Sequence, residues 1–277
     1  MGELYGLLGH PVGHSMSPVM HNDAFAALDL PHHYHAFDVH PDELTEAVKG
    51  LKALGVKGFN VTIPHKVNIM PLLDVIDEEA AAIGAVNTVV NENGKLIGYN
   101  TDGQGYIESL LPKLTAPLSA QKLLLIGAGG AARAIFVSLA NRGVKQVDIA
   151  NRTVSKAETI IADCPFPSAS KALSLEEAET AINDYDVIIQ TTAVGMSPKV
   201  DEMPLRLGRL EKGKIISDII YNPLKTKWLS TAEEKGAIIH GGIGMFVGQG
   251  ALAFERWTGI QPDMKRMESI VRQQLGG

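Results

Sequence analysis

The sequence has a single cysteine, Cys164, among its 277 residues, so an intramolecular disulfide is excluded. It also lacks an apolar run of the roughly 18 residues that a membrane-spanning helix needs. The N-terminus, Met1-Gly2-Glu3-Leu4-Tyr5, lacks the basic region and following apolar stretch that mark a signal peptide. These absences predict a cytoplasmic protein, because a chain that folds without disulfides suits a reducing compartment.

Positive charge is also in short supply, since 25 Lys and Arg stand against 31 Asp and Glu, a formal net charge of −6. Nucleic-acid-binding proteins present a basic surface, so this balance disfavours a nucleic-acid partner but leaves room for a local cationic pocket. Hydrophobic residues make up 45% of the chain, which is enough for a buried core. At roughly 100–200 residues per domain, the length fits one large domain or two ordinary ones.

The middle of the chain has the pattern of a parallel α/β fold. Lys122–Ile126 is a continuous apolar run typical of a buried parallel strand, and an alanine-rich helix is predicted over Ala131–Arg142. Further strands are predicted over Gln146–Ala150, Val187–Gln190 and Lys214–Asp218. Strands that alternate with helices indicate parallel βαβ units.

The first hundred residues mix helices with strands that need not be parallel. The predicted segments there are strands over Leu4–Gly9, Tyr34–Val39, Gly58–Ile63, Val86–Asn91 and Lys95–Tyr99 and a helix over Pro41–Leu54. Asn93-Gly94 between the last two strands is a strong hairpin signal. Two helical segments, Ile243–Trp257 and Asp263–Gln273, follow the middle of the chain and could return to the first domain.

A glycine pattern between a buried strand and a helix indicates a dinucleotide site. In Gly127-x-Gly129-x-x-Ala132, the first glycine permits a tight turn and the second lets the backbone approach a pyrophosphate. The small third residue allows close helix–strand packing, and the helix N-terminus favours the negative charge. A purely structural turn is the alternative, which the strand–turn–helix context disfavours.

The next strand favours NADP over NAD. An acidic residue that binds the ribose of NAD is expected about 20 residues past the glycines, at the end of that strand. The strand ends instead in Asn151-Arg152-Thr153, and Asp148 lies too early within it. Arg152 could pair with a 2′-phosphate, with Thr153 and Lys156 adding contacts, although a loop arginine can also be merely solvated.

Polar residues in the first hundred positions gather where predicted strands end. They are Ser15, Ser17, Thr62, Lys66, Asn87 and Asp102. Each has a plainer reading: Ser17 could cap a helix in which Pro18 is the first residue, Lys66 could be a surface lysine, and Asp102 could be a first-turn acid. As a set, hydroxyls, an amide, one cation and one acid suit a polyhydroxylated carboxylate.

These segments resemble the shikimate dehydrogenase family across nearly the whole chain. The matching stretches are Gly13-His14-Ser15-Met16-Ser17-Pro18, His21-Asn22, Asn60-Val61-Thr62-Ile63-Pro64-His65-Lys66, Gly84-Ala85-Val86-Asn87-Thr88, Tyr99-Asn100-Thr101-Asp102-Gly103, Gly127-Ala128-Gly129-Gly130-Ala131, Asn151-Arg152-Thr153, Tyr221-Asn222-Pro223 and Gly244-Met245-Phe246-Val247-Gly248-Gln249. They occur in the family's order, which makes the combined signal far more specific than a glycine loop alone. His10 stands where relatives often have asparagine or tyrosine.

The resemblance implies two α/β domains and an NADP-dependent enzyme. A substrate-binding domain would comprise residues 1–101 and 240–277, and a Rossmann-like NADP-binding domain residues 102–239, with the active site in the cleft between them. The implied reaction is reversible reduction of 3-dehydroshikimate to shikimate, in the shikimate pathway to chorismate and the aromatic amino acids. Small-molecule substrates are then the expected partners, and a homodimer is compatible with the family.

The resemblance also implies residue roles. Lys66 and Asp102 match the catalytic pair, and no metal is required because lysine supplies the electrophile. The substrate-binding positions are Ser15, Ser17, Thr62, Asn87, Tyr221 and Gln249. The cofactor-binding positions are Gly127, Ala128, Gly129, Gly130, Ala131, Asn151, Arg152, Thr153 and Lys156, with Glu78, Ile219 and Gly242 as weaker matches.

Four other readings remain. The run His32, His33, His35 and His40 could bind a metal, but it offers no cysteine and no helical i, i+4 pair, so solvated histidines are favoured. Cys164 lacks a neighbouring base and reads as a loop residue. The rival functions are a quinate/shikimate dehydrogenase with broader substrate or NAD use and a catalytically silent NADP-binding sensor. The presence of both Lys66 and Asp102 favours an enzyme over the sensor.

Overall fold

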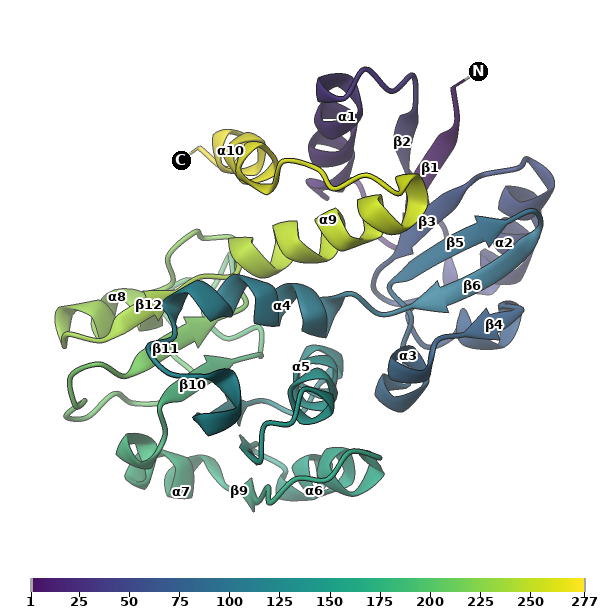
Figure 1. Cartoon of the computed structure of the whole chain (residues 1–277). Coiled ribbons are helices and arrows are strands. Elements are labelled where there is room, and N and C mark those ends of the chain that lie inside the picture. Colours follow the sequence, from purple (N-terminus) through teal and green to yellow (C-terminus); the bar gives the residue numbers. More distant parts are fainter. Residues whose placement is uncertain (1, 277) are drawn as a thin grey trace. The chain divides into compact units, whose positions relative to one another are not determined.

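The computed structural model describes residues 2–276, which form two compact units (Figure 1). The first unit comprises the chain up to Asp102 together with the chain from Val247 onward, and the second unit is Gly103–Phe246. Within residues 2–276, no helix combines the length and the apolar character needed to cross a bilayer.

The first unit contains a mixed six-stranded sheet in the order β2-β1-β3-β5-β6-β4. Its strands are β1 (Leu4–Gly9), β2 (His33–Asp38), β3 (Gly58–Val61), β4 (Val75–Ile76), β5 (Thr88–Glu92) and β6 (Lys95–Tyr99). Its helices are α1 (Ser17–Ala27), α2 (Leu44–Ala53), α3 (Glu78–Ile83) and α10 (Met264–Gln274). The hairpin of β5 and β6 turns at Asn93 and Gly94, both with positive φ, so the turn prediction is confirmed.

The second unit contains a six-stranded sheet, parallel at every pair, in the order β12-β11-β10-β7-β8-β9. Its strands are β7 (Lys122–Ile126), β8 (Gln146–Ala150), β9 (Ala172–Leu173), β10 (Val187–Gln190), β11 (Ile215–Asp218) and β12 (Ile238–His240). Its helices are α5 (Gly130–Asn141), α6 (Val154–Asp163), α7 (Leu175–Thr180) and α8 (Lys227–Glu234). The predicted parallel βαβ arrangement is therefore confirmed for this part of the chain.

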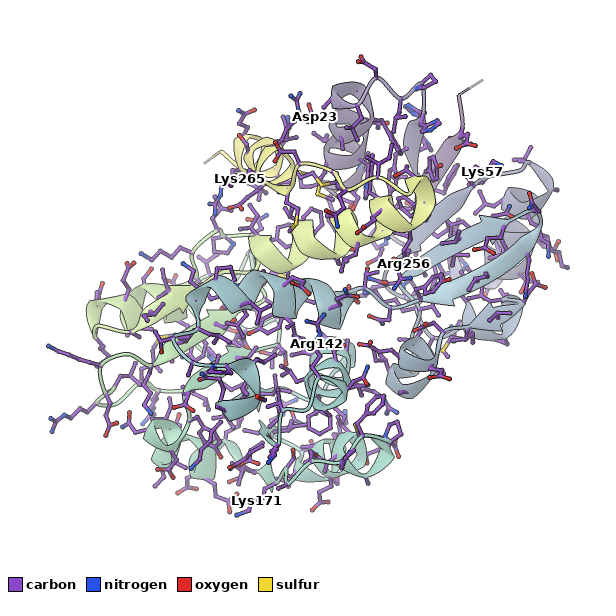
Figure 2. All side chains as sticks on the ribbon, viewed as in Figure 1. Asp23, Lys57, Arg142, Lys171, Arg256 and Lys265 are labelled. Atoms are coloured by element: carbon purple, nitrogen blue, oxygen red, sulfur yellow. The ribbon has the colours of Figure 1, made fainter. Side chains whose placement is uncertain are left out.

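Two helices contain the boundaries between the units. α4 (Asp102–Leu110) begins at the last residue before the second unit, and α9 (Ile243–Thr258) includes its last residues. The C-terminal helix α10 packs on α1, as the predicted return of the chain to the first domain requires. Arg266 of α10 donates two hydrogen bonds, of 2.6 and 2.8 Å, to the carboxylate of Asp23 on α1, a residue labelled in Figure 2.

Two helix starts differ from the sequence-based expectation. The helix expected over Pro41–Leu54 begins as a 3₁₀ turn, Pro41–Glu43, before α2. Ser17 is not the capping residue: it is the first residue of α1, and Met16, which precedes it, makes no side-chain capping hydrogen bond. The plainer reading of Ser17 is therefore wrong, which leaves its hydroxyl free of that role.

The core of each unit lies against its own sheet. In the first unit, Val48 and Leu51 of α2 pack with Phe59 of β3 and Val89 of β5. In the second unit, Leu124 of β7 and Ile188 of β10 pack with Trp228 of α8. Burial of this apolar surface is the main term that stabilises the two sheets and so fixes the strand ends where polar side chains gather.

Candidate active site

Lys66 and Asp102 form an ion pair although 36 residues separate them. Lys66 follows the turn after β3, and its carbonyl accepts a hydrogen bond of 2.8 Å from the Val86 N–H. Asp102 is the first residue of α4, just past the end of β6. The Lys66 ammonium donates to Asp102 Oδ2 at 2.5 Å, and the two side chains are 30% and 12% exposed. A partly exposed charged pair of this kind is accessible to a small polar molecule.

Asn87 joins the same pair from the start of β5. Its Nδ2 donates to Asp102 Oδ1 at 2.8 Å and to Thr101 Oγ1 at 3.0 Å. Its Oδ1 accepts from the Thr101 N–H at 2.8 Å. Both oxygens of Asp102 therefore have a donor, one from an amide and one from an ammonium. Sequence analysis had not singled out Thr101, whose role rests on contacts between distant segments.

The remaining substrate candidates of the first unit come from three other segments. Ser15 Oγ donates to Ser17 Oγ at 3.2 Å and accepts from the Ser17 N–H at 3.2 Å. Thr62 is half-buried just after β3. Gln249 lies on α9, and its carbonyl accepts a hydrogen bond of 3.1 Å from Thr101 Oγ1. The structure thus places Gln249 beside the Asn87–Asp102 group.

Tyr221 belongs to the second unit, unlike the other substrate candidates. Its ring packs against Phe246 with 4.8 Å between the centroids. Burial raises the pKa of the Tyr221 phenol above its usual value, so the phenol is protonated at neutral pH. A protonated phenol can donate a hydrogen bond to an anionic group.

The glycine loop of the second unit follows β7, which lies beside β10 in the sheet. After β7 the chain continues into β8 on one side of β7, whereas β10, β11 and β12 follow one another on its other side. The loop after β7 therefore lies where the strand order reverses. Gly127 has φ of +112°, and a Cβ there would lie 2.7 Å from Thr191 Oγ1 and from Thr192 Cγ2. A Cβ on Gly129 or Gly130 would meet no atom within 4 Å.

Gly129 and Gly130 lie at the start of α5. The first N–H groups of this helix have no partner within the helix. Gly129 precedes the helix and carries no side chain that could cap it. Bare backbone donors at a helix start suit a pyrophosphate. Residues Gly127 to Ala131 therefore have the shape and the donors that a dinucleotide requires.

The segment after β8 carries the cationic candidates. Asn151 Nδ2 donates to the Thr153 carbonyl at 2.8 Å, which holds the turn before α6. Arg152, Thr153 and Lys156 are all exposed there. Two cations beside the glycine loop fit a 2′-phosphate better than a bare ribose.

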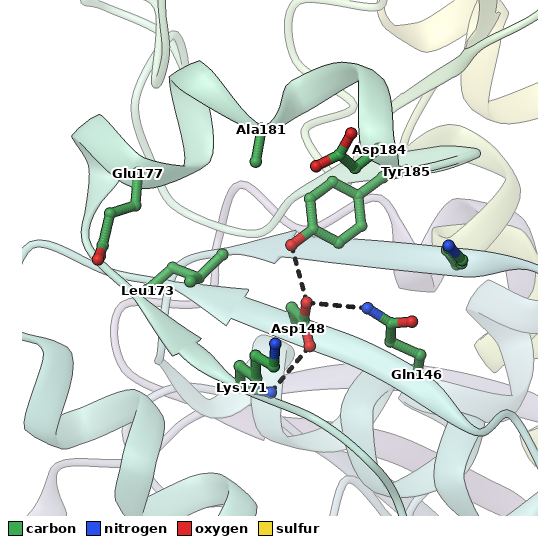
Figure 3. Close-up of a pocket in the computed structure, with 9 residues that line it drawn as sticks. Gln146, Asp148, Lys171, Leu173, Glu177, Ala181, Asp184 and Tyr185 are labelled. Atoms are coloured by element: carbon green, nitrogen blue, oxygen red, sulfur yellow. Dashed lines mark hydrogen bonds between the residues drawn. The ribbon is translucent and has the colours of Figure 1, made fainter.

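Asp148 is buried within β8, and Figure 3 shows its carboxylate among Tyr185, Lys171 and Gln146. Its carboxylate accepts hydrogen bonds from the Tyr185 hydroxyl at 2.8 Å, the Lys171 N–H at 2.8 Å and Gln146 Nε2 at 3.2 Å. All three partners are supplied by the protein, so Asp148 fixes local structure. It cannot serve as the ribose-binding acid of an NAD enzyme.

The weaker cofactor candidates are divided between the units, with Glu78 in the first and Ile219 and Gly242 in the second. A Cβ on Gly242 would lie 2.1 Å from the Ile219 carbonyl oxygen, so the two backbones touch. Glu78 is the exposed first residue of α3 in the first unit.

Asp218 was not predicted from the sequence. It is a buried carboxylate that accepts hydrogen bonds from the Ile220 N–H at 3.0 Å and from Thr226 Oγ1 at 2.8 Å. Burial raises its pKa to about 6, and only the fold reveals that burial.

Metal-binding groups are absent within the described part of the chain, residues 2–276, where no three His, Cys, Asp or Glu side chains gather to hold an ion. His10 and His40 pair with neighbouring aspartates at the surface. Burial raises the pKa of the Cys164 thiol, which disfavours the reactive thiolate.

Comparison with known proteins gives a consistent result. Residues 7–89 match the model of the shikimate dehydrogenase substrate binding domain, residues 109–203 that of shikimate / quinate 5-dehydrogenase, and residues 242–272 that of the shikimate 5'-dehydrogenase C-terminal domain. A shikimate dehydrogenase (NADP(+)) from Geobacillus sp. (strain WCH70) is 57% identical over 277 residues, 100% of both chains.

Two solved structures are similar over almost the whole chain. A shikimate dehydrogenase in complex with NADP⁺ has a TM-score of 0.91 and 41% identity, over 99% of this chain and 96% of the other. A shikimate 5-dehydrogenase from Thermus thermophilus, in complex with NADP(H) and shikimate, has a TM-score of 0.88 and 35% identity. That match covers 98% of this chain and 99% of the other.

Proposed function

The chain belongs to the shikimate dehydrogenase family, and on that premise we propose that it catalyses the reversible NADPH-dependent reduction of 3-dehydroshikimate to shikimate. The observation that carries the proposal for this chain is the Lys66–Asp102 ion pair beside Asn87. That group supplies a cation, an acid and an amide within one unit. A ring bearing a ketone and hydroxyls offers matching partners for all three.

Lys66 acts on the oxygen of the ketone. Reduction adds hydride to the ring carbon and a proton to the oxygen, so negative charge develops on that oxygen in the transition state. An ammonium aimed at it stabilises the transition state more than the neutral ketone. NADPH supplies the hydride when it is bound, and Lys66 Nζ supplies or orients the proton.

Asp102 holds the ammonium in place through its Oδ2. A lysine side chain has several rotatable bonds, so a fixed partner reduces the number of positions that its nitrogen can occupy. In the oxidative direction the shikimate hydroxyl must lose a proton. The Lys66 ammonium has no lone pair to accept it, so the Asp102 carboxylate is the acceptor that the pair offers.

Substrate binding and cofactor binding are assigned to different units. We assign substrate binding to the first unit, with Ser15 and Ser17 at the substrate carboxylate and Thr62 and Gln249 nearer the ring. We assign cofactor binding to the second unit, through the loop from Gly127 and the segment from Asn151 to Lys156. The exposed glycine edge, the helix start and the two cations support this assignment.

Arg152 tests the cofactor assignment. We expect Arg152→Ala to raise the KM for NADPH by roughly 10- to 100-fold and to leave activity with NADH unchanged, because a hydrogen bond to a charged group contributes about 1.5–3 kcal/mol. Steady-state kinetics with both cofactors measure this. Arg142→Ala is the matched control, since Arg142 (Figure 2) pairs with Glu108 on the same unit. Equal loss with both cofactors would remove Arg152 from the 2′-phosphate site.

Ser15 tests the substrate assignment. Ser15→Ala should raise the KM for shikimate by roughly 10- to 100-fold with little change in kcat, because the lost hydroxyl would contact the carboxylate and not the reacting carbon. Ser269→Ala, on the exposed face of α10 in the same unit, is the control. If Ser15→Ala changes neither constant, the substrate carboxylate is bound elsewhere.

The function itself is tested by four assays on the purified protein. Shikimate or quinate is combined with NADP⁺ or NAD⁺, and formation of reduced nicotinamide is followed by its absorbance. We expect the highest kcat/KM with shikimate and NADP⁺. Dominant activity with quinate and NAD⁺ would favour the quinate dehydrogenase reading, and no activity in any assay would favour a silent NADP sensor.

Small molecules are the proposed partners, and shikimate is supported by the relative that was solved with it. A homodimer and a cytoplasmic location stay predictions. Size-exclusion chromatography with light scattering measures the first, and fractionation of the source cells measures the second.

A further inference from the structure

A line of buried hydrogen bonds in the first unit starts at the serine pair. Ser15 Oγ donates to Ser17 Oγ, and Ser17 in turn hydrogen-bonds Tyr34. Burial raises the pKa of Tyr34 well above its usual value, and the Ser17 contact only partly opposes this. The Tyr34 phenol therefore stays protonated and donates to Asn60 Oδ1 at 2.8 Å.

Tyr34 is itself held rigidly. Its backbone N–H and carbonyl bond to the two side-chain ends of Asn22 at 2.8 and 2.9 Å. Its ring stacks on His21 with 4.5 Å between centroids. Burial lowers the pKa of His21 to about 3, so the stacked imidazole is neutral. Tyr34 is thus a fixed anchor for the bonds that follow.

The line continues from β3 to β5. Asn60 Oδ1 is occupied as an acceptor, so Asn60 Nδ2 is the end that donates, to Thr88 Oγ1 at 3.1 Å and to the Asn87 carbonyl at 3.2 Å. A hydroxyl has one proton. Thr88 Oγ1 accepts from Asn60, and its own proton can reach Asn87 Oδ1 at 3.0 Å or Thr101 Oγ1 at 3.3 Å. The contact to Asn87 is the shorter of the two.

This bond and the hydrogen bond from the Thr101 N–H together set which way the Asn87 amide faces. With Oδ1 turned to Thr88 and to the Thr101 N–H, Nδ2 must face Asp102 Oδ1. The reversed amide would set two oxygens against each other at the carboxylate. Asn60 and Thr88 are both almost fully buried, so neither is placed to touch a substrate.

We propose that Asn60 and Thr88 are positioning residues for the reaction: they orient the Asn87 amide, which in turn holds Asp102 in the geometry that Lys66 needs. The proposal rests on the proposed function, since it concerns the same pair. It assigns a catalytic consequence to two residues that touch neither Lys66 nor Asp102.

A purely structural role is the competing explanation. Asn60 and Thr88 face each other in the antiparallel ladder of β3 and β5, so their hydrogen bond could serve only to join the two strands. The two explanations differ in one respect. A structural role lowers stability alone, whereas a positioning role lowers kcat in the folded protein and acts through Asp102.

Thr88→Val removes the hydroxyl and keeps the shape of the side chain. We expect kcat for shikimate oxidation to fall roughly 3- to 10-fold with a smaller change in KM, since one neutral hydrogen bond is lost while the Thr101 N–H still holds Asn87. Thr88→Ser should restore kcat to within about twofold of the wild type, because the hydroxyl returns. If the valine variant does not fold, Thr88→Ala replaces it.

Thr258→Val is the matched control. Thr258 lies on α9 in the same unit, where its hydroxyl donates to the Phe254 carbonyl. It loses a comparable hydrogen bond away from Lys66 and Asp102. We expect its thermal stability to change while kcat does not. A folded Thr88→Val protein with the kcat of the wild type would overturn the proposal.

A double-mutant cycle with Asp102→Asn decides whether Thr88 acts through Asp102. We expect Thr88→Val to cost little further activity in the Asp102→Asn background, because the carboxylate that it positions is gone. The same fold-loss in both backgrounds would overturn the proposal. Failure of the proposed function would look different, since the wild-type protein would then not oxidise shikimate at all.

Discussion

Replacing Lys66 by alanine is expected to lower kcat for shikimate oxidation by roughly 10²–10⁴-fold, the usual range for loss of an acid–base group. Lys66 is the cation of the polar group in the first unit, and its nitrogen lies 2.5 Å from Asp102 Oδ2. Without it, the charge on the reacting oxygen has no ammonium beside it, and the Asp102 carboxylate would oppose that charge. Steady-state kinetics in both reaction directions measure the effect.

The matched control is Lys49→Ala, because Lys49 is an exposed lysine of the same unit that pairs with Glu46. Its kcat and KM should equal those of the wild type. Near-normal turnover in a folded Lys66→Ala protein would remove Lys66 from the mechanism, whatever the effect of other substitutions.

Asp102→Asn is expected to lower kcat by roughly 10²-fold or more. The substitution keeps the size of the side chain but removes the charge that balances the Lys66 ammonium. The new amide also sets a donor against either Lys66 or Asn87, both of which already donate to this position. The measurement is kcat at saturating shikimate and NADP⁺, with a folding check by thermal melting.

Asp42→Asn serves as the control for that charge change, since Asp42 lies at the surface beside His40 in the same unit. If Asp102→Asn raised only the KM for shikimate and left kcat intact, Asp102 would bind substrate without taking part in the chemical step.

The candidate cofactor site was predictable because its signals are local. A buried strand, two glycines and a helix lie within one short stretch, so Gly127 and Gly129 identify the turn without any knowledge of distant contacts. The strand β8 belongs to the same βαβ unit as the glycine turn. The end of β8, and with it Arg152, could therefore be placed beside that turn. The hairpin at Asn93-Gly94 was found for the same reason.

The candidate substrate site was predictable only through resemblance, because its contacts are long-range. Nothing in the residues alone shows that Lys66 and Asp102, 36 positions apart, would meet. Asn60 and Thr88 looked like ordinary strand residues until the register of β3 and β5 set them opposite each other. The capping alternative for Ser17 was wrong, because a Ser-Pro helix start looks the same in the sequence when the serine is the first helical residue.

Short elements escaped the sequence analysis for a related reason. β4 and β9 have two residues each and β12 has three, too few to show a period of alternation. Their strand character depends on an edge that the longer strands provide. Asp218 was missed in the same way, since its burial depends on how β11 lies in the sheet.

A crystal structure of the protein with bound shikimate tests the central claim most directly. We predict that Lys66 Nζ and an Asp102 carboxylate oxygen both lie within hydrogen-bonding distance of the hydroxyl that the enzyme oxidises, with Ser15 and Ser17 at the substrate carboxylate. A shikimate molecule bound with its ring hydroxyls away from both Lys66 and Asp102 would contradict the account.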